Sequence, residues 1–141
     1  MGKKVNMAIV GLGFGSEFIP IYQNHPDVNL VAICQRTKDK LDKIGDTFGV
    51  EKRYTEFEEL IKDKDIDAIH INTPIHNHAL HSIAGLKAGK HVACTVPMAT
   101  TVDECKKIAA ILSQMPTKGL AYTKQVLNMS FTNTFEDQLQ Q

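Results

Sequence analysis

A glycine-rich loop, Gly-Leu-Gly-Phe-Gly-Ser at positions 11–16, is the part of the sequence with the clearest chemistry. Gly11 permits a tight turn, and Gly13 lets backbone amides approach a pyrophosphate, whose charge is favoured at the amino terminus of a following helix. Ser16 takes the third glycine position, where a small residue still allows close packing of helix on strand. A merely structural turn is the alternative. The loop predicts a diphosphate-nucleotide site with contacts from Gly11, Gly13, Phe14 and Gly15.

A second polar group, Gln35-Arg36-Thr37-Lys38, follows the next apolar run. In NAD-binding folds an acidic side chain here binds the ribose hydroxyls, but this position holds Gln35. Arg36 and Lys38 have the charge to bind a 2′-phosphate, so NADP is predicted at least as readily as NAD. A solvated basic start to a helix is the alternative. The missing acid also makes an S-adenosylmethionine-dependent methyltransferase the weaker hypothesis.

Alternating apolar runs and amphipathic segments must position these residues. The repeated strand–helix pattern predicts an α/β fold, a doubly wound, Rossmann-like parallel sheet with helices on both faces and ligands at the carboxyl ends of its strands. Thr55 with Glu58, and Thr101 with Glu104, have the spacing of capping boxes at helix starts. Strands are expected at 5–10, 28–34, 52–54, 67–72 and 91–95, and helices at 14–23, 37–48, from 55 onward, 78–88 and 101–112.

The length of 141 residues suits one domain. We expect a dinucleotide-binding domain over residues 1–124, with one more strand at 118–123. Residues 125–141 are polar and weakly patterned, so this tail is assigned no structure.

The composition, 43% hydrophobic and 23% charged, is that of a globular protein. Sixteen basic residues balance sixteen acidic ones, which argues against nucleic-acid or membrane partners, and we expect a cytoplasmic protein. Three widely spaced cysteines predict reduced thiols rather than disulfides. Four histidines between 70 and 81 have no carboxylate or cysteine at ligand spacing, so no metal site is predicted.

Three motifs in register, the glycine loop, Asn-Thr-Pro-Ile-His-Asn-His at 72–78 and Ala-Gly-Lys-His-Val at 88–92, resemble those of the Gfo/Idh/MocA oxidoreductases. The resemblance covers roughly residues 3–112. It implies the first of two domains in an enzyme that uses NAD(P) to oxidise or reduce sugars, inositols and related polyols. The family's second domain supplies most substrate contacts and the oligomer interface. It is absent from these 141 residues, so a truncated or altered relative is expected.

The same resemblance places Thr73, Pro74 and His78 on the nicotinamide side of the cofactor. His78 is a candidate for direct participation, although a histidine on a first helical turn is more often a partly exposed cap. After the fifth strand the family usually has Glu-Lys-Pro, with a lysine that contacts cofactor and substrate. This chain has Thr95-Val96-Pro97 instead.

Valine cannot donate, accept or titrate a proton, so the usual catalytic lysine is missing at Val96 and the catalytic residue stays unassigned. Thr95 and Pro97 remain expected cofactor contacts. Lys90 is close in sequence, but we expect it to point out at the amino-terminal edge of the sheet, away from the site.

Three functional hypotheses follow. The first is an NAD(P)-binding domain of a sugar or polyol oxidoreductase, inactive alone and acting on substrate only with a second domain. The second is a non-catalytic dinucleotide-binding or sensing module, suggested by Val96. The third is a structural remnant that self-associates as a homo-oligomer through its sheet edge or its Gln-rich tail.

Overall fold

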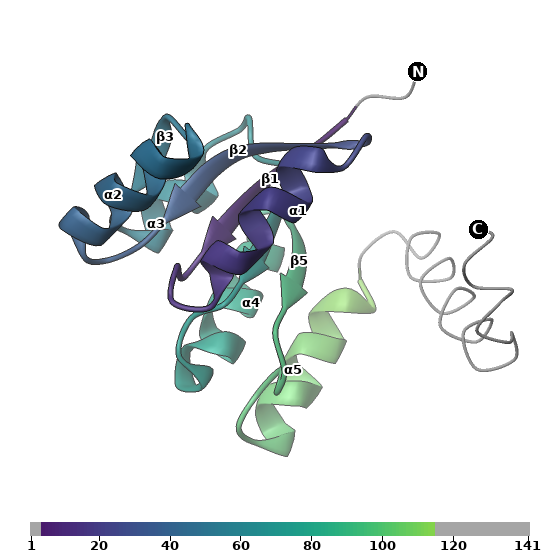
Figure 1. Ribbon diagram of the computed structural model, residues 1–141. Helices are drawn as coiled ribbons and strands as arrows, with labels where there is room; N and C mark the ends of the chain where they lie inside the picture. Colours follow the sequence, from purple (N-terminus) through teal and green to yellow (C-terminus); the bar gives the residue numbers. More distant parts are fainter. Residues whose placement is uncertain (1–3, 115–141) are drawn as a thin grey trace, which may run out of the picture.

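The computed structural model describes residues 4–114, which form a five-stranded parallel sheet (Figure 1). The strand order is β3-β2-β1-β4-β5, and every pair of neighbouring strands is parallel. This confirms the predicted doubly wound, Rossmann-like sheet, whose order reverses on either side of β1. The strands are β1 (Val5–Val10), β2 (Val28–Cys34), β3 (Lys52–Tyr54), β4 (Ala68–Ile71) and β5 (His91–Cys94).

Helices connect the strands and cover both faces of the sheet (Figure 1). Helices α1 and α2 pack on one face, and α3 and α4 pack on the other. Helix α5 packs against α4. The helical segments are η1 (Gly15–Phe18), α1 (Ile19–Asn24), α2 (Lys38–Phe48), α3 (Phe57–Lys62), η2 (Ile75–Asn77), α4 (His78–Lys87) and α5 (Val102–Leu112).

The apolar runs of the strands are continuous because the sheet is buried on both faces. In β1, Ile9 packs with the α1 and α2 side chains, whereas Ala8 and Val10 pack with those of α3 and α4. Successive side chains of a strand point to opposite faces, so two covered faces require apolar residues at nearly every position.

Two of the predicted helix starts differ from the structure. The predicted helix 14–23 is broken, because it begins as η1 and becomes α-helical only at Ile19, just before Pro20. Proline has no N–H to donate within a helix and is favoured in a first turn, so α1 starts at this point.

The two predicted capping boxes have different outcomes. The one at Thr55 and Glu58 is wrong: α3 begins at Phe57, which is buried in the core, and its N-cap Glu56 makes no side-chain capping bond. The capping box of Thr101 and Glu104 is confirmed at α5. The predicted strand 118–123 and the tail 125–141 lie outside the described residues. Within residues 4–114, each helix is too short or too polar to cross a membrane.

The amino-terminal edge of the sheet is closed by Lys90. Its side chain does not point out into solvent as expected, but is buried with 7% exposure. The Lys90 Nζ donates to the carbonyl oxygens of Asp63 (2.5 Å) and Ile66 (2.7 Å). Lys90 thereby joins the start of β5 to the segment between α3 and β4, at the edge opposite the glycine loop.

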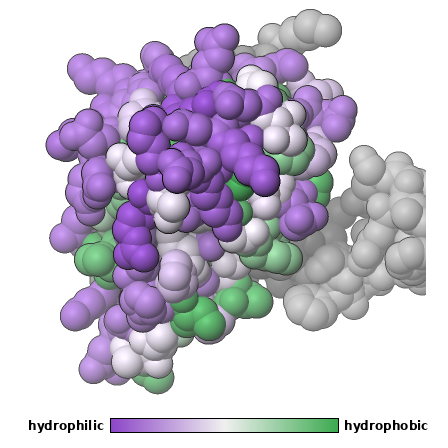
Figure 2. Space-filling view, turned by 60° about the vertical axis from the view of Figure 1, so that its left-hand side comes forward, coloured by the Kyte–Doolittle hydropathy of each residue, from purple (hydrophilic) through white to green (hydrophobic). Residues whose placement is uncertain are grey.

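The surface of the domain is mostly polar, with a few exposed apolar side chains. Figure 2 presents a mostly hydrophilic face, with hydrophobic side chains gathered in a few patches. Among the exposed apolar residues are Phe14, Ile75 and Val96, which belong to the loops that follow β1, β4 and β5. These three strands are neighbours in the sheet, so the loops share its carboxyl edge.

Candidate functional site

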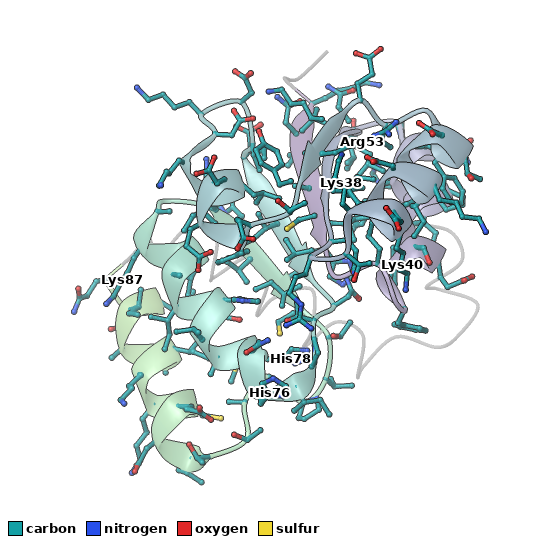
Figure 3. The ribbon with its side chains drawn as sticks, turned by 90° about the vertical axis from the view of Figure 1, so that its left-hand side faces the viewer. Lys38, Lys40, Arg53, His76, His78 and Lys87 are labelled. Carbon is teal, nitrogen blue, oxygen red and sulfur yellow. The ribbon has the colours of Figure 1, made fainter. Side chains whose placement is uncertain are left out.

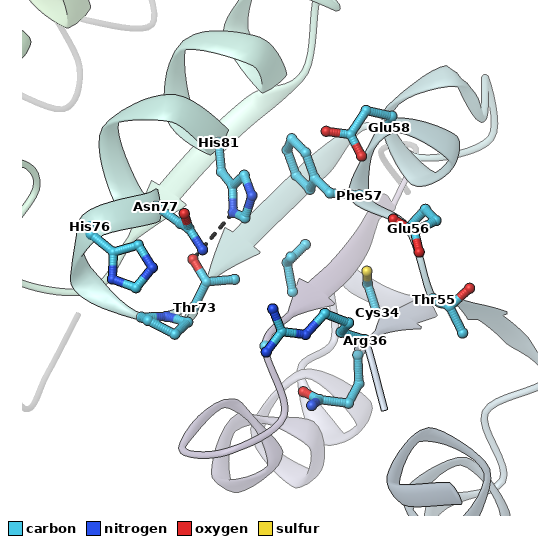
Figure 4. Close-up of a pocket in the computed structure, with 14 residues that line it drawn as sticks. Cys34, Arg36, Thr55, Glu56, Phe57, Glu58, Thr73, His76, Asn77 and His81 are labelled. Atoms are coloured by element: carbon cyan, nitrogen blue, oxygen red, sulfur yellow. Dashed lines mark hydrogen bonds between the residues drawn. The ribbon is translucent and has the colours of Figure 1, made fainter. Parts of the chain in front are cut away.

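A pocket of about 340 Å³ opens at the carboxyl edge of the sheet (Figure 4). Its walls come from the segments that follow β1, β2, β3 and β4, which lie side by side in the strand order. This is the position at which parallel sheets of this class bind ligands. The lining residues are Val10, Gly11, Cys34, Gln35, Arg36, Thr55, Glu56, Phe57, Glu58, Thr73, Pro74, His76, Asn77 and His81.

The glycine loop is shaped by close approach of its backbone to β4. Gly11 has φ +89°, and a Cβ there would lie 2.6 Å from the Asn72 carbonyl oxygen. At Gly15 a Cβ would lie 3.0 Å from the Ile9 side chain. Gly13 differs, since a Cβ there would have nothing within 4 Å. Gly11 and Gly15 therefore allow the close packing of the turn, and Gly13 leaves open space beside the loop.

Phe14 and Ser16 complete this loop. Phe14 is exposed and its ring meets that of Phe18 edge to face at 5.4 Å. The Ser16 hydroxyl lies 3.4 Å from the Gly13 carbonyl oxygen. The apolar Leu12 between the glycines is fully buried and anchors the loop to the core.

The end of β2 separates the two predicted basic contacts. Arg36 lines the pocket and points toward Thr73 across it (Figure 4). Lys38 instead pairs with Asp42 at 2.9 Å on the exposed side of α2 and is not among the lining residues. Figure 3 shows Lys38 near Arg53, apart from His76 and His78. The structure thus brings only one of the two basic residues to the pocket.

Gln35, which stands where NAD-binding sheets carry an acid, lines the same pocket. Its side-chain Oε1 accepts a hydrogen bond of 3.0 Å from the Leu12 amide. Its backbone amide donates to Tyr54 in β3. Gln35, at the end of β2, therefore links the glycine loop to β3.

The opposite wall is aromatic and was not predicted from the sequence. The rings of Phe57 and His81 stack with centroids 4.3 Å apart and planes 25° apart (Figure 4). His81 Nδ1 lies 3.2 Å from the Thr73 hydroxyl. Burial lowers the pKa of His81, which favours the neutral ring. A planar, uncharged surface of this kind suits contact with a flat heterocycle.

Two carboxylates, Glu56 and Glu58, also line this wall. They follow β3, so the rule that ligands lie beyond strand ends would have pointed to them. Cys34 lies beneath the pocket, where burial, with Glu56 and Glu58, raises the pKa of its thiol to about 12. A thiol with this pKa is no nucleophile near neutral pH.

Thr73 and Pro74 line the pocket as predicted, but His78 is buried behind them. His78 Nδ1 lies 2.7 Å from the Pro97 carbonyl oxygen, and Nε2 lies 2.7 Å from the Thr73 carbonyl oxygen. Both ring nitrogens are occupied by backbone. His78 is therefore neither a partly exposed cap nor open to a ligand in this arrangement.

The loop after β5 contains the remaining predicted residues. The Thr95 hydroxyl donates to the Ile71 carbonyl oxygen at 3.1 Å, which fastens the end of β5 to β4. Val96 follows with 90% of its surface exposed, and the Val96–Pro97 peptide is cis. The predicted residues that do not line the pocket are Gly13, Phe14, Gly15, Lys38, His78, Thr95 and Pro97.

Comparison with known proteins agrees with this geometry. Residues 5–122 match the family model GFO_IDH_MocA, described as an oxidoreductase family with an NAD-binding Rossmann fold. The chain is 32% identical over 103 residues to inositol 2-dehydrogenase of Salmonella typhimurium, which covers 71% of this chain and 31% of that one. It is also 32% identical over 90 residues to the uncharacterized oxidoreductase ORF334 of Rhizobium meliloti, covering 64% and 27%.

Solved structures show the same likeness. Scyllo-inositol dehydrogenase from Lactobacillus casei, with bound NAD(H) and scyllo-inositol, superposes with a TM-score of 0.74 at 27% identity, covering 79% of this chain and 34% of that one. A probable dehydrogenase from Thermotoga maritima gives 0.75 at 28% identity, covering 78% and 33%. This chain spans about a third of the length of these proteins. The chain belongs to the Gfo/Idh/MocA oxidoreductase family, of which it forms the NAD-binding Rossmann fold.

Proposed function

We propose that the chain is the NAD(P)-binding domain of an oxidoreductase that acts on sugars, inositols or related polyols. The observation that carries the proposal is the glycine loop, where the turn at Gly11 and the open space at Gly13 would let a pyrophosphate approach the backbone. The polyol class is supported by the similarity to inositol 2-dehydrogenase and scyllo-inositol dehydrogenase.

The residues of the pocket fit a dinucleotide. Arg36 and the stacked Phe57–His81 pair would hold the adenosine half between a planar cation and an aromatic wall. The loops at Thr73 and Thr95–Pro97 would border the nicotinamide half. When bound, the nicotinamide supplies hydride transfer, and this chain supplies binding and orientation.

The choice between NAD and NADP rests on a few charges. Arg36 favours a 2′-phosphate, whereas Glu56 and Glu58 on the facing wall repel one. Lys38, paired with Asp42, adds little to the pocket. Both cofactors belong to the proposal, with Arg36 the residue that decides how well NADP competes.

Turnover is proposed to require a second domain. Most of the family's substrate contacts come from that domain, and position 96 carries valine in place of the usual lysine. This chain alone is therefore expected to bind a dinucleotide without oxidising a polyol.

Isothermal titration calorimetry of residues 1–141 with NAD and with NADP tests the proposal. Binding of either at micromolar to millimolar concentration supports it, and Gly13→Ala is the matched variant that should weaken binding without unfolding the chain. If neither cofactor binds at millimolar concentration, the proposal is wrong.

A second candidate is a non-catalytic dinucleotide-binding or sensing module, which the exposed Val96 favours. The test is a longer protein in which this chain is joined to a family substrate domain. Polyol-dependent reduction of NAD(P) with Val96 retained would support the oxidoreductase. Cofactor binding without turnover would support the binding module, and Val96→Lys should then restore turnover.

A further inference from the structure

The buried ring of His78 lies between two backbone acceptors. One nitrogen faces the carbonyl oxygen of Thr73, after β4, and the other faces that of Pro97, after β5, each at 2.7 Å. Only 2% of the residue is exposed. Water is therefore not a ready substitute for either partner.

A carbonyl oxygen only accepts hydrogen bonds, so each of the two contacts needs an N–H from the ring. A neutral imidazole has one N–H, and its second nitrogen would direct a lone pair at a carbonyl oxygen. The imidazolium has two N–H groups and satisfies both acceptors. The hydrogen-bond geometry therefore selects the charged ring.

We propose that His78 is held as an imidazolium that clamps the loop after β4 to the loop after β5, and so positions the nicotinamide side of the site. This role extends the proposed dinucleotide binding and depends on it for its functional meaning. His78 is a positioning residue, because it acts through the backbone of Thr73 and Pro97.

A titratable neighbour of the His78 ring is His81, on the same helix. On the same helix, burial lowers the pKa of His81, Glu58 of α3 raises it, and a positive charge at His78 lowers it. The neutral His81 removes a repulsive neighbour from His78. Burial of the ring and the amino-terminal end of the η2–α4 segment both disfavour a cation, and the two charge-assisted bonds oppose these effects.

The clamp also fixes the loop after β4 relative to the loop after β5. Thr95 already fastens β5 to β4 through its hydroxyl and the Ile71 carbonyl oxygen. His78 adds a second connection two residues beyond each of these positions, at Thr73 and Pro97. Together the two connections hold the neighbouring loops at the edge where a cofactor would pass.

The protonation state is tested by long-range ¹H–¹⁵N correlation spectra of the full chain labelled with ¹⁵N-histidine, at pH 7.5. We expect both ring nitrogens of His78 at the chemical shifts of protonated nitrogens, while His81 shows one protonated and one bare nitrogen. His78→Gln identifies the signal by its loss. If that variant does not fold, through-bond correlation from the His78 backbone assigns it in the native chain. A neutral His78 ring overturns the proposal.

The functional part is tested by cofactor affinity. His78→Gln should weaken NAD binding about tenfold, because the loops on the nicotinamide side lose their fixed arrangement, and leave AMP binding unchanged, because AMP lacks the nicotinamide half. His91→Gln, an exposed histidine at the other end of β5, is the control and should change neither. Equal weakening of NAD and AMP would overturn the positioning role. A native chain that binds neither ligand would disprove the proposed function, and the spectra would still decide the state of His78.

Discussion

The side-chain oxygen of Gln35 accepts a hydrogen bond of 3.0 Å from the backbone amide of Leu12, so the end of β2 holds the glycine loop directly. The residue that replaces the usual ribose-binding acid is thus also a support for the loop that would bind the pyrophosphate. Changes at position 35 are therefore expected to affect both the ribose side of the cofactor and the loop that would bind its pyrophosphate.

Gln35→Glu should preserve the acceptor for Leu12 and add a negative charge beside the pocket. We expect NADP affinity to fall roughly tenfold or more, because the carboxylate repels a 2′-phosphate, while NAD affinity stays within about threefold. Calorimetry with both cofactors measures the difference. Gln35→Leu, which removes the acceptor without adding charge, should weaken both cofactors alike; selective loss of NADP in that variant would contradict the explanation.

Arg36 and Lys38 provide a matched pair of basic residues, one in the pocket and one outside it. Arg36→Ala should reduce NADP affinity about tenfold through the loss of a charge-assisted contact. Lys38→Ala removes only an exposed pair with Asp42 and should change affinity less than about twofold. Equal effects of the two substitutions would show that proximity to the pocket does not decide cofactor choice.

Gly11 and Gly13 should respond differently to the same substitution. Gly11→Ala forces a side chain into the Asn72 backbone at positive φ, which we expect to cost about 2–4 kcal/mol of unfolding free energy. Gly13→Ala meets open space and should change stability by less than about 0.5 kcal/mol. Urea unfolding measures both. Retained cofactor affinity in Gly13→Ala would argue against phosphate binding at this loop.

Acidification should destabilise the fold through His70. Burial lowers the pKa of His70 below its usual value of 6.5, so the unfolded chain binds the proton more readily than the folded one. The stabilising effect of the neutral ring is complete above pH 6.5 and is lost as the pH falls toward the folded pKa. The contribution of His70 to the free energy of unfolding should therefore fall as the pH is lowered from 8 to 5.

Two variants separate the causes of this pH effect. His70→Gln should reduce the slope of stability against pH, because the titrating ring is gone. Tyr22→Phe removes the hydroxyl that lies 3.0 Å from His70 Nδ1 and should leave the slope in place, since burial is the cause of the shift. An unchanged slope in His70→Gln would assign the effect to other groups.

Lys90 is expected to be structural. Lys90→Met leaves the carbonyl oxygens of Asp63 and Ile66 without their donor and should cost about 1–3 kcal/mol in thermal or urea unfolding. Lys87→Met, at an exposed position of α4, is the control and should stay within about 0.5 kcal/mol. If Lys90→Met leaves the free energy of unfolding unchanged, position 90 stabilises the fold through packing of its aliphatic chain, which methionine retains, rather than through the two hydrogen bonds.

The sequence predicted the sheet well because its signal is local. β1, β2 and β3 have the expected bounds, since apolar residues on both faces of a parallel strand leave a continuous run. The start of α3 was wrong because burial of Phe57 in the core, rather than side-chain capping at Thr55, decides where that helix begins.

The site was only half visible in the sequence. Gly11, Gln35, Arg36, Thr73 and Pro74 follow strand ends in familiar patterns, and the structure brings them to one pocket. The Phe57–His81 wall joins two helices that are far apart in the chain, so no spacing rule indicates it. The two carbonyl partners of His78 are backbone atoms, and they carry no side-chain signature at all.

The exposure of Val96 has an evolutionary consequence. A side chain with 90% of its surface in solvent contributes little to folding, so selection for stability hardly constrains position 96. Under the proposed function, substitutions there would act on the chemistry beside the nicotinamide rather than on stability. The history of lysine and valine at this one position, traced through related genes, would then follow changes in catalysis without interference from selection for stability.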